Sequence, residues 1–224
     1  MAKHLDLEEQ EQLAEIKHFW NEYGNLITWV LIAVFAAIAA WNGWHYWERT
    51  QSTQAAAMYD EVERAAQAGE TSRVERAFSD MKDKFGRTTY AQQAGLLAAK
   101  VLEEKGNMDG AKAALAWVAD KASDEGYQAV ARLRLASILV QAKAYDDALR
   151  QLSASFPKEF EALAADRRGD VYKLQGKKAQ AQAEYTQAYK GLDESTEYRR
   201  LLEVKLTALG VDTRQLAAAG AAKP

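Results

Sequence analysis

The sequence predicts an all-α protein, in which a single transmembrane helix is followed by a solenoid of helical hairpins. Residues of high helix propensity, mainly Ala, Leu, Glu, Lys, Gln and Arg, dominate the chain, and Pro157 and Pro224 are its only prolines. Such side chains lose little rotamer freedom in a helix. Between Gly24 and Trp47 there is no Asp, Glu, Lys or Arg, and beyond Arg49 amphipathic segments of helix length alternate with short breaks.

Composition and motifs argue against several classes of function. A net charge of -3 argues against a nucleic-acid-binding protein, which normally has a clustered basic face. The absence of cysteine removes disulfides and thiolate metal sites, and fits any redox compartment. His4, His18 and His45 form no i, i+4 metal-binding pair, and neither a G-x-S-x-G turn nor a glycine-rich phosphate loop occurs. We therefore expect no enzyme activity, no catalytic residue, and no metal or other cofactor.

The uncharged stretch at residues 25–47 has the length and composition of a transmembrane helix. As a helix, Leu26–Trp47 would span roughly 33 Å, enough for a hydrocarbon core of about 30 Å. Tryptophan and tyrosine favour the headgroup region of a bilayer, so the expected interfacial anchors are Trp20, Trp44, Tyr46 and Trp47. Small residues at helical spacing predict a face that packs against another membrane helix: Ala33, Ala36, Ala37, Ala40 and Gly43.

Two alternatives compete with a retained membrane anchor. The length of the stretch, its lack of charge and its terminal aromatics disfavour a buried helix of a soluble protein. A cleaved signal peptide is the stronger competitor, because Ala37-Ile38-Ala39 has the small-x-small form of a cleavage site. A signal peptide needs a short basic n-region, however, whereas residues 1–24 are acidic. Orientation stays open, because Lys17 on one side balances Arg49 and Arg64 on the other.

Residues 1–24 are predicted to form an acidic, amphipathic tail. Asp6 and Glu9 make a capping box for a helix expected from Leu7 to Tyr23. Its acidic face would be repelled by anionic lipid, which disfavours a purely lipid-binding role. The tail is either an amphipathic approach to the membrane or a docking element for a basic partner surface.

Internal repeats appear when the breaks at Gly106, Lys143 and Gly176 are aligned. A small residue stands seven positions before each break, another stands five positions after it, and a large apolar residue follows four positions later. These columns are Ala99, Ala136 and Gly169; Ala111, Ala148 and Ala181; and Leu115, Leu152 and Tyr185. Small residues let two helices cross closely, and the pattern is that of tetratricopeptide-like repeats, although their marker tryptophan is absent. An irregular helical bundle is the alternative.

The repeat domain is expected to span residues 48–209. A weaker first unit breaks at Gly69, with Val74 and Phe78 in its second helix, and Thr196–Leu209 forms a final capping helix. Residues 210–224, rich in alanine, are predicted to be a disordered tail. The first helices of the units should line a concave surface, whose candidate contacts are Leu96, Lys100, Leu133, Ser137, Asp166 and Asp170.

Four sequence motifs accompany this layout of acidic tail, single span and repeats. They are Phe19-Trp20-Asn-Glu-Tyr-Gly24, Gly43-Trp44-His45-Tyr46-Trp47, Ala129-Val-Ala-Arg-Leu-Arg-Leu-Ala136 and Ala164-Ala-Asp-Arg-Arg-Gly-Asp170. Together with the layout they resemble the YfgM-type family, the ancillary subunits of the bacterial Sec translocon. The resemblance implies a single-pass inner-membrane protein with a cytoplasmic tail and a periplasmic repeat domain. Its implied partners are the SecYEG channel, a membrane-anchored periplasmic chaperone and client polypeptides, as well as the lipid bilayer.

The function expected from these observations is that of a tethered, non-enzymatic scaffold. The membrane helix would hold the repeat domain beside the channel, where it would link the channel to periplasmic chaperones and assist secreted or outer-membrane proteins. The alternative is a membrane-tethered regulator of an envelope stress response, which would act by sequestering a protein partner.

Overall fold

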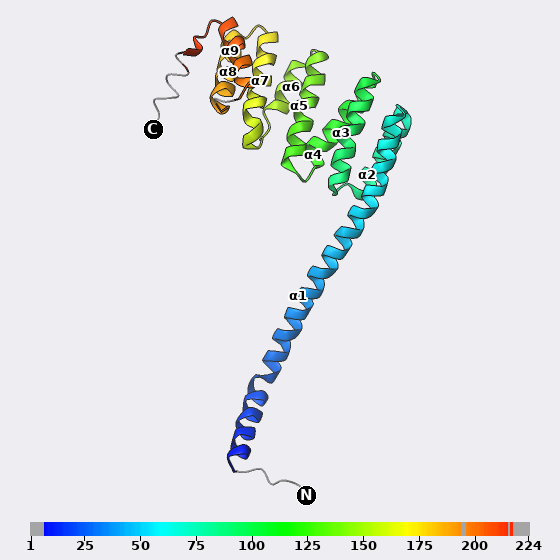
Figure 1. Cartoon of the computed structure of the whole chain (residues 1–224), viewed down its shortest axis with the longest axis vertical. Helices are drawn as coiled ribbons and strands as arrows, with labels where there is room; N and C mark the ends of the chain where they lie inside the picture. Colours follow the sequence, from blue (N-terminus) through cyan, green and yellow to red (C-terminus); the bar gives the residue numbers. More distant parts are fainter. Residues whose placement is uncertain (1–6, 194–195, 215, 217–224) are drawn as a thin grey trace. The chain divides into compact units, whose positions relative to one another are not determined.

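The described part of the chain is entirely helical and falls into two units. The computed structural model describes residues 7–193, 196–214 and 216, with side chains described from Gln12 onward. One unit comprises Met1–Gln51 and the other Ser52–Pro224. The helices in order along the chain (Figure 1) are α1 Leu7–Gln67, α2 Thr71–Phe85, α3 Thr89–Glu104, α4 Met108–Lys121, α5 Glu125–Gln141, α6 Tyr145–Leu152, α7 Lys158–Leu174, α8 Lys178–Gly191 and α9 Tyr198–Ala208.

Helix α1 is continuous through the segments that the sequence divides into a tail helix and a transmembrane helix. Gly24, where the predicted tail helix ends, is helical, and its backbone carbonyl accepts a hydrogen bond from Thr28 Oγ1 at 2.7 Å. The indole of Trp20 covers this glycine, since a Cβ built there would lie 3.3 Å from Trp20 Nε1. The last part of α1, after Gln51, belongs to the second unit and buries Ala55, Val62 and Ala65.

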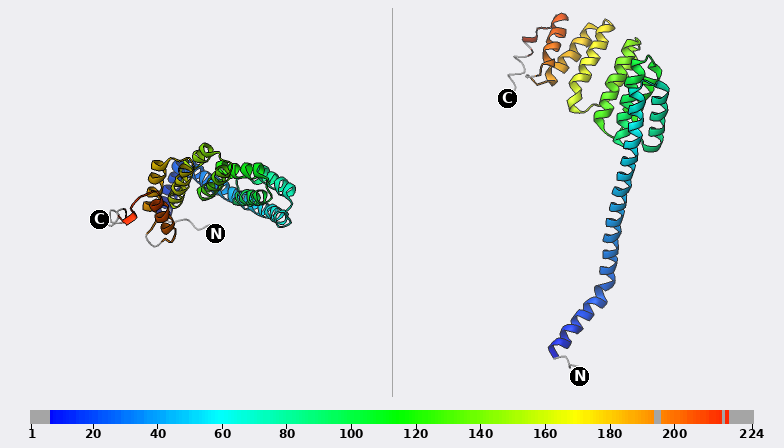
Figure 2. Two further views of the ribbon diagram at one scale, coloured as in Figure 1. Left: turned by 90° about the horizontal axis from the view of Figure 1, so that it is seen from above. Right: turned by 45° about the vertical axis from the view of Figure 1, so that its right-hand side comes forward.

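The second unit consists of four helical hairpins and a capping helix (Figure 2). The hairpins pair the end of α1 with α2, α3 with α4, α5 with α6, and α7 with α8. Their turns lie at the four predicted breaks, and each break residue has a positive φ: 67° at Gly69, 80° at Gly106, 60° at Lys143 and 73° at Gly176. This left-handed conformation ends a helix and satisfies its last carbonyls. At Gly106, for example, the following Asn107 N–H donates to Leu102 O at 2.8 Å.

The predicted small and large columns form the interior of the hairpins. Eight of the nine residues in these columns are buried hydrophobic side chains with at most 2% exposure, and the ninth, Gly169, is a buried glycine. The glycine is required by its neighbour, because a Cβ at this position would lie 2.5 Å from Tyr185 Cδ1. The all-α solenoid of tetratricopeptide-like hairpins predicted from the sequence is therefore confirmed.

Helix α9 closes the second unit, as the sequence predicts. Leu202 and Leu206 are fully buried and pack with Tyr185 and Ala188 of α8. Val211 and Leu216, which follow the predicted end of the domain at Leu209, pack against the same cluster. Residues 215 and 217–224 of the predicted disordered tail lie outside the described residues, as do residues 1–6 of the acidic tail.

Candidate functional site

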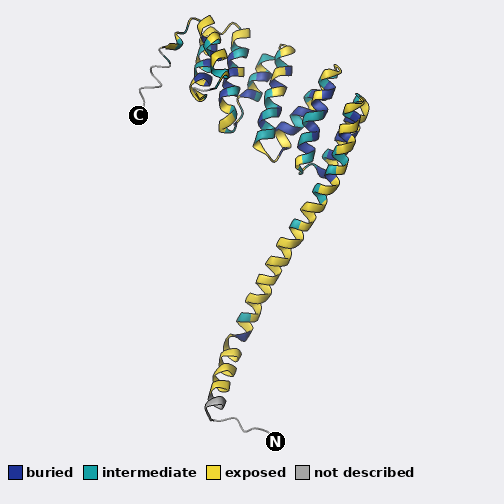
Figure 3. Cartoon of the chain, in the orientation of Figure 1, coloured by how far each residue is buried: buried dark blue, intermediate teal, exposed yellow. Residues whose placement is uncertain are grey.

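The apolar part of α1 exposes almost all of its side chains (Figure 3). Within the described part of the chain, α1 is the one helix long and apolar enough to cross a membrane, and only 6% of its most apolar window is buried. A core helix of a water-soluble domain would bury that window, so the structure offers the apolar stretch no protein environment. A lipid bilayer provides a suitable apolar environment, because its hydrocarbon core accepts apolar side chains and a helix satisfies its own backbone hydrogen bonds.

The predicted interfacial anchors lie at the two ends of this stretch. Trp20 is 61% exposed, Trp44 58%, Tyr46 75% and Trp47 48%. The Trp44 and Trp47 rings lie 5.5 Å apart, and Trp41 meets His45 edge to face at 4.6 Å. Between the two ends, the predicted small residues lie exposed on α1: Ala33, Ala36, Ala37, Ala40 and Gly43. A Cβ at Gly43 would meet no atom within 4 Å.

The six candidate concave-face residues lie on the first helices of three hairpins, as their register requires. Lys100 and Ser137 are exposed, whereas Leu96 and Leu133 are half-buried against the core clusters. Asp166 differs from the expectation, because its side chain is 0% exposed and so offers no surface contact. Three of the six, Leu133, Ser137 and Asp170, line one small pocket between α5 and α7.

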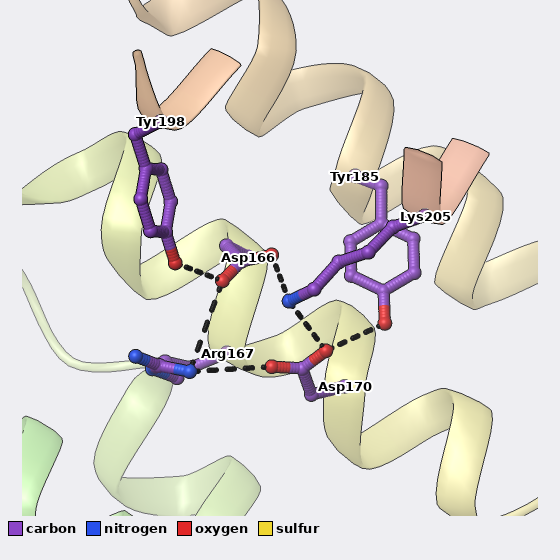
Figure 4. Close-up of polar contacts among 6 residues, drawn as sticks. All are labelled: Asp166, Arg167, Asp170, Tyr185, Tyr198 and Lys205. Carbon is purple, nitrogen blue, oxygen red and sulfur yellow. Dashed lines mark hydrogen bonds and ion pairs between the residues drawn. The ribbon is translucent and has the colours of Figure 1, made fainter. Parts of the chain in front are cut away.

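Asp166 and Asp170 belong to a polar network that joins α7 to α8 and α9 (Figure 4). Lys205 Nζ lies 2.7 Å from Asp166 Oδ1 and 2.7 Å from Asp170 Oδ1. Tyr198 donates its hydroxyl to Asp166 Oδ2 at 2.6 Å, and Tyr185 donates to Asp170 Oδ1 at 2.7 Å. Arg167 completes the network with contacts of 3.9 Å to Asp166 and 3.4 Å to Asp170.

The charges of this network balance, because two carboxylates face one guanidinium and one ammonium group. Burial, the hydrogen bond to Asp170 and nearby negative charge raise the pKa of Tyr185 above its ordinary value. Burial, the hydrogen bond to Asp166 and its charge likewise raise the pKa of Tyr198. Both hydroxyls therefore remain donors, and the carboxylates are fully engaged. Such an arrangement holds α9 in place and offers no free acid, base or nucleophile.

Sequence reasoning did not identify Tyr185, Tyr198, Arg167 and Lys205 as partners of the two aspartates. A signal does exist in the repeat register: Asp166 and Asp170 occupy the positions that face the first helix of the following unit. Lys205 stands five residues before the next turn glycine, Gly210, where it meets them. Among the described residues, no group of three or more His, Cys, Asp or Glu side chains could hold a metal ion.

Comparison with known proteins agrees with this architecture. A family model described as "Tetratricopeptide repeat-like domain" matches residues 17–211. A protein of Neisseria gonorrhoeae named "Ancillary SecYEG translocon subunit" is 31% identical over 210 residues, which cover 93% of this chain and 100% of the relative. Proteins of the same name from Haemophilus influenzae (28% identity, 81% of this chain, 89% of the relative) and Escherichia coli (27%, 91% and 97%) are also similar.

The matched residues include both the apolar stretch of α1 and all four hairpins, so the similarity covers the whole layout. It also confirms the resemblance that the sequence motifs indicate. The chain, which combines one apolar N-terminal helix with a tetratricopeptide-like repeat domain, belongs to the ancillary SecYEG translocon subunit family.

Proposed function

We propose that this chain is a non-enzymatic scaffold, anchored by α1 in the bacterial inner membrane and associated with the SecYEG channel. The N-terminus lies in the cytoplasm and the repeat domain in the periplasm, where it links the channel to a membrane-anchored chaperone and to emerging client polypeptides. The names of the relatives support association with the channel over the alternative of a stress-response regulator.

The observation that carries this proposal is the exposed apolar stretch of α1, which lies inside the region matched by the family model. A match that begins at residue 17, before the stretch, and continues to residue 211 supports a retained anchor over a cleaved leader. Anchoring raises the effective concentration of the repeat domain at the membrane, so weak contacts with clients and chaperones suffice there.

The small face of α1 is the proposed contact with a helix of the channel. Small side chains let two helix backbones approach each other closely, which strengthens van der Waals packing between the helices within a membrane. Ala36 and Ala40 lie one turn apart on this face, whereas Val34 and Ile38 lie on the opposite side of the helix, because each residue turns by about 100°.

Site-specific photo-crosslinking in intact cells tests this contact. A photoreactive amino acid at Ala36 should form adducts with channel subunits, and the same probe at Ile38 should form far fewer. The matched double variants Ala36→Leu with Ala40→Leu and Val34→Leu with Ile38→Leu extend the comparison: the first should weaken co-purification of the channel, and the second should not. Adducts with a stress-response component in place of channel subunits would overturn the proposal.

Topology reporters test the proposed orientation independently. Alkaline phosphatase, which is active only after export, should be active when fused after Pro224 and inactive when fused before Met1. The reverse pattern would place the repeat domain in the cytoplasm and would refute a role beside emerging clients.

A further inference from the structure

Two polar side chains lie inside the apolar stretch of α1, and they differ in their hydrogen bonding. Within residues 26–44, the side chains that end in a hydroxyl or a carboxamide are those of Thr28 and Asn42. Thr28 Oγ1 donates to Gly24 O of its own helix at 2.7 Å. Asn42 is exposed, and its carboxamide makes no hydrogen bond within the part of the chain that the structure describes. Asn42 is therefore the residue of this stretch whose side chain lacks a partner in its own helix.

Asn42 lies at the depth of the hydrocarbon core when α1 crosses a bilayer. It stands about 8 Å along the helix from the middle of the Leu26–Trp47 stretch, and the core extends about 15 Å to each side of the bilayer midplane. The interfacial anchors Trp44 and Trp47 follow it toward the headgroup region. An amide without a hydrogen-bond partner is strongly disfavoured in an apolar medium, and lipid tails offer it none. The carboxamide of Asn42 therefore favours a second helix that supplies a polar group at the same depth.

Large apolar side chains continue the face of α1 that carries Asn42. Because each residue turns a helix by about 100°, the residues four, seven and eleven positions before Asn42 lie within about 40° of it around the axis. These residues are Ile38, Phe35 and Leu31, which are all exposed and which form, with Asn42, the Asn42 face. Alternating steps of four and three residues are the spacing of a two-stranded supercoil, in which Asn42 takes the first position of the heptad. Ala40 of the small face lies about 160° away, so the two faces can be occupied together.

We infer that the Asn42 face packs against the same face of a second copy of this chain, forming a parallel pair of α1 helices in the membrane. Copies of a single-pass protein insert in one direction, so each residue at the seam meets its own counterpart across a two-fold axis. A carboxamide suits this position, because it carries both a donor and an acceptor and can bond to an identical carboxamide. A second copy supplies that group at the required depth. The pairing goes beyond the proposed function, because the small face remains available to the channel.

Disulfide crosslinking of the full chain in native membranes tests the pairing, and the absence of cysteine from the chain removes any background. Ile38→Cys lies on the Asn42 face, so mild oxidation should give a disulfide-linked dimer that contains both tags when two differently tagged copies are present. Ala40→Cys, on the small face, should give at least about tenfold less dimer, because the two sulfur atoms would point apart. Equal yields from both positions would overturn the inference. So would a photoreactive amino acid at Phe35 that forms adducts with a different protein and none with a second copy.

Matched asparagine substitutions in the Ile38→Cys chain test the role of the amide. Asn42→Leu keeps the helix apolar but removes the hydrogen bond, and should lower the yield of dimer by about three- to tenfold at low expression. Asn25→Leu makes the same change near the other end of the stretch, about 100° away around the helix, and should leave the yield unchanged. Asn42→Gln retains a carboxamide and should retain most of the dimer. An unchanged yield in Asn42→Leu, or an equal loss in Asn25→Leu, would refute pairing through Asn42.

The pairing and the proposed channel contact fail separately. Channel adducts from Ala36 together with no dimer from Ile38→Cys would refute the pairing alone. Dimer from Ile38→Cys with no channel adducts from Ala36 would refute the channel contact alone. Recovery of the chain outside the membrane fraction would refute both, because each requires α1 to lie in the bilayer.

Discussion

The close contact between Gly169 and Tyr185 predicts how the fourth hairpin responds to an added methyl group. Both residues are buried, and an added Cβ would lie 2.5 Å from both Tyr185 Cδ1 and Cε1. The ring has little room to move, because its hydroxyl is held by Asp170. In the preceding unit, the counterparts of Gly169 and Tyr185 are Ala136 and Leu152, which pack in one buried cluster.

Gly169→Ala should therefore destabilise the repeat domain. Overpacking of a buried contact costs about 1–3 kcal/mol, and the gain in helix propensity from Gly to Ala returns about 1 kcal/mol. The 2.5 Å contact with two ring atoms places the cost in the upper part of that range, about 2–3 kcal/mol, so we expect a net loss of about 1–2 kcal/mol. Tyr185→Leu should also destabilise, because it leaves a cavity and removes a hydrogen bond. Combined with Gly169→Ala, however, it recreates the Ala/Leu pair of the preceding unit, so the double variant should be more stable than the sum of the single losses by at least about 1 kcal/mol.

Urea unfolding of the detergent-solubilised chain, followed by far-ultraviolet circular dichroism, measures all four members of this double-mutant cycle. Additivity within about 0.5 kcal/mol would show that the two positions do not interact. That result, or a Gly169→Ala variant as stable as the parent, would refute the explanation given for the glycine.

Two further predictions concern the turns and the α9 network. Lys143 has the left-handed backbone conformation (φ 60°) that glycine has at the other hairpin turns, and this conformation is strained for a residue with a Cβ. Lys143→Gly should therefore stabilise the domain by about 1 kcal/mol in the same urea assay. A loss of stability would contradict backbone strain at this turn. The pKa of Tyr198 is raised on folding, so its contribution to stability is full below pH 10 and is lost as the pH rises beyond that value. Thermal unfolding across this range should show a decline that is smaller in Tyr198→Phe; an equal decline in both proteins would exclude the tyrosine as its source.

The features predicted correctly from the sequence are those that depend on local chemistry. A helix that ends in a left-handed residue favours glycine there, and two helices that cross closely favour alanine or glycine at the crossing. A short stretch of sequence is therefore enough to predict the turn at Gly106 and the close crossing at Ala99 and Ala111. The length of the apolar stretch similarly follows from hydrocarbon thickness.

Other features depend on contacts that no short window contains. Asp166 looks like a surface residue in sequence, but its partners Tyr198 and Lys205 lie 32 and 39 residues further along the chain. The pocket beside Ser137 is equally non-local, because it arises from side chains of α5 and α7 that are both shorter than their counterparts at the next junction. Continuity of α1 through Gly24 also escaped the sequence pattern, since Trp20 packs over this glycine from within the helix itself.

The way the solenoid ends follows from the same turn chemistry. Gly210, after α9, has φ 83°, and the next N–H, from Val211, donates to Leu206 O at 3.0 Å, repeating the bond that follows each hairpin turn. Helix α9 thus has the geometry of a first helix in a fifth hairpin. Seven residues before its turn, however, stands Glu203 in place of the small residue of the three preceding units, and its carboxylate accepts a hydrogen bond from Tyr189 at 3.2 Å. A charged side chain of this size prevents the close helix crossing that defines the hairpins, so α9 serves as a cap.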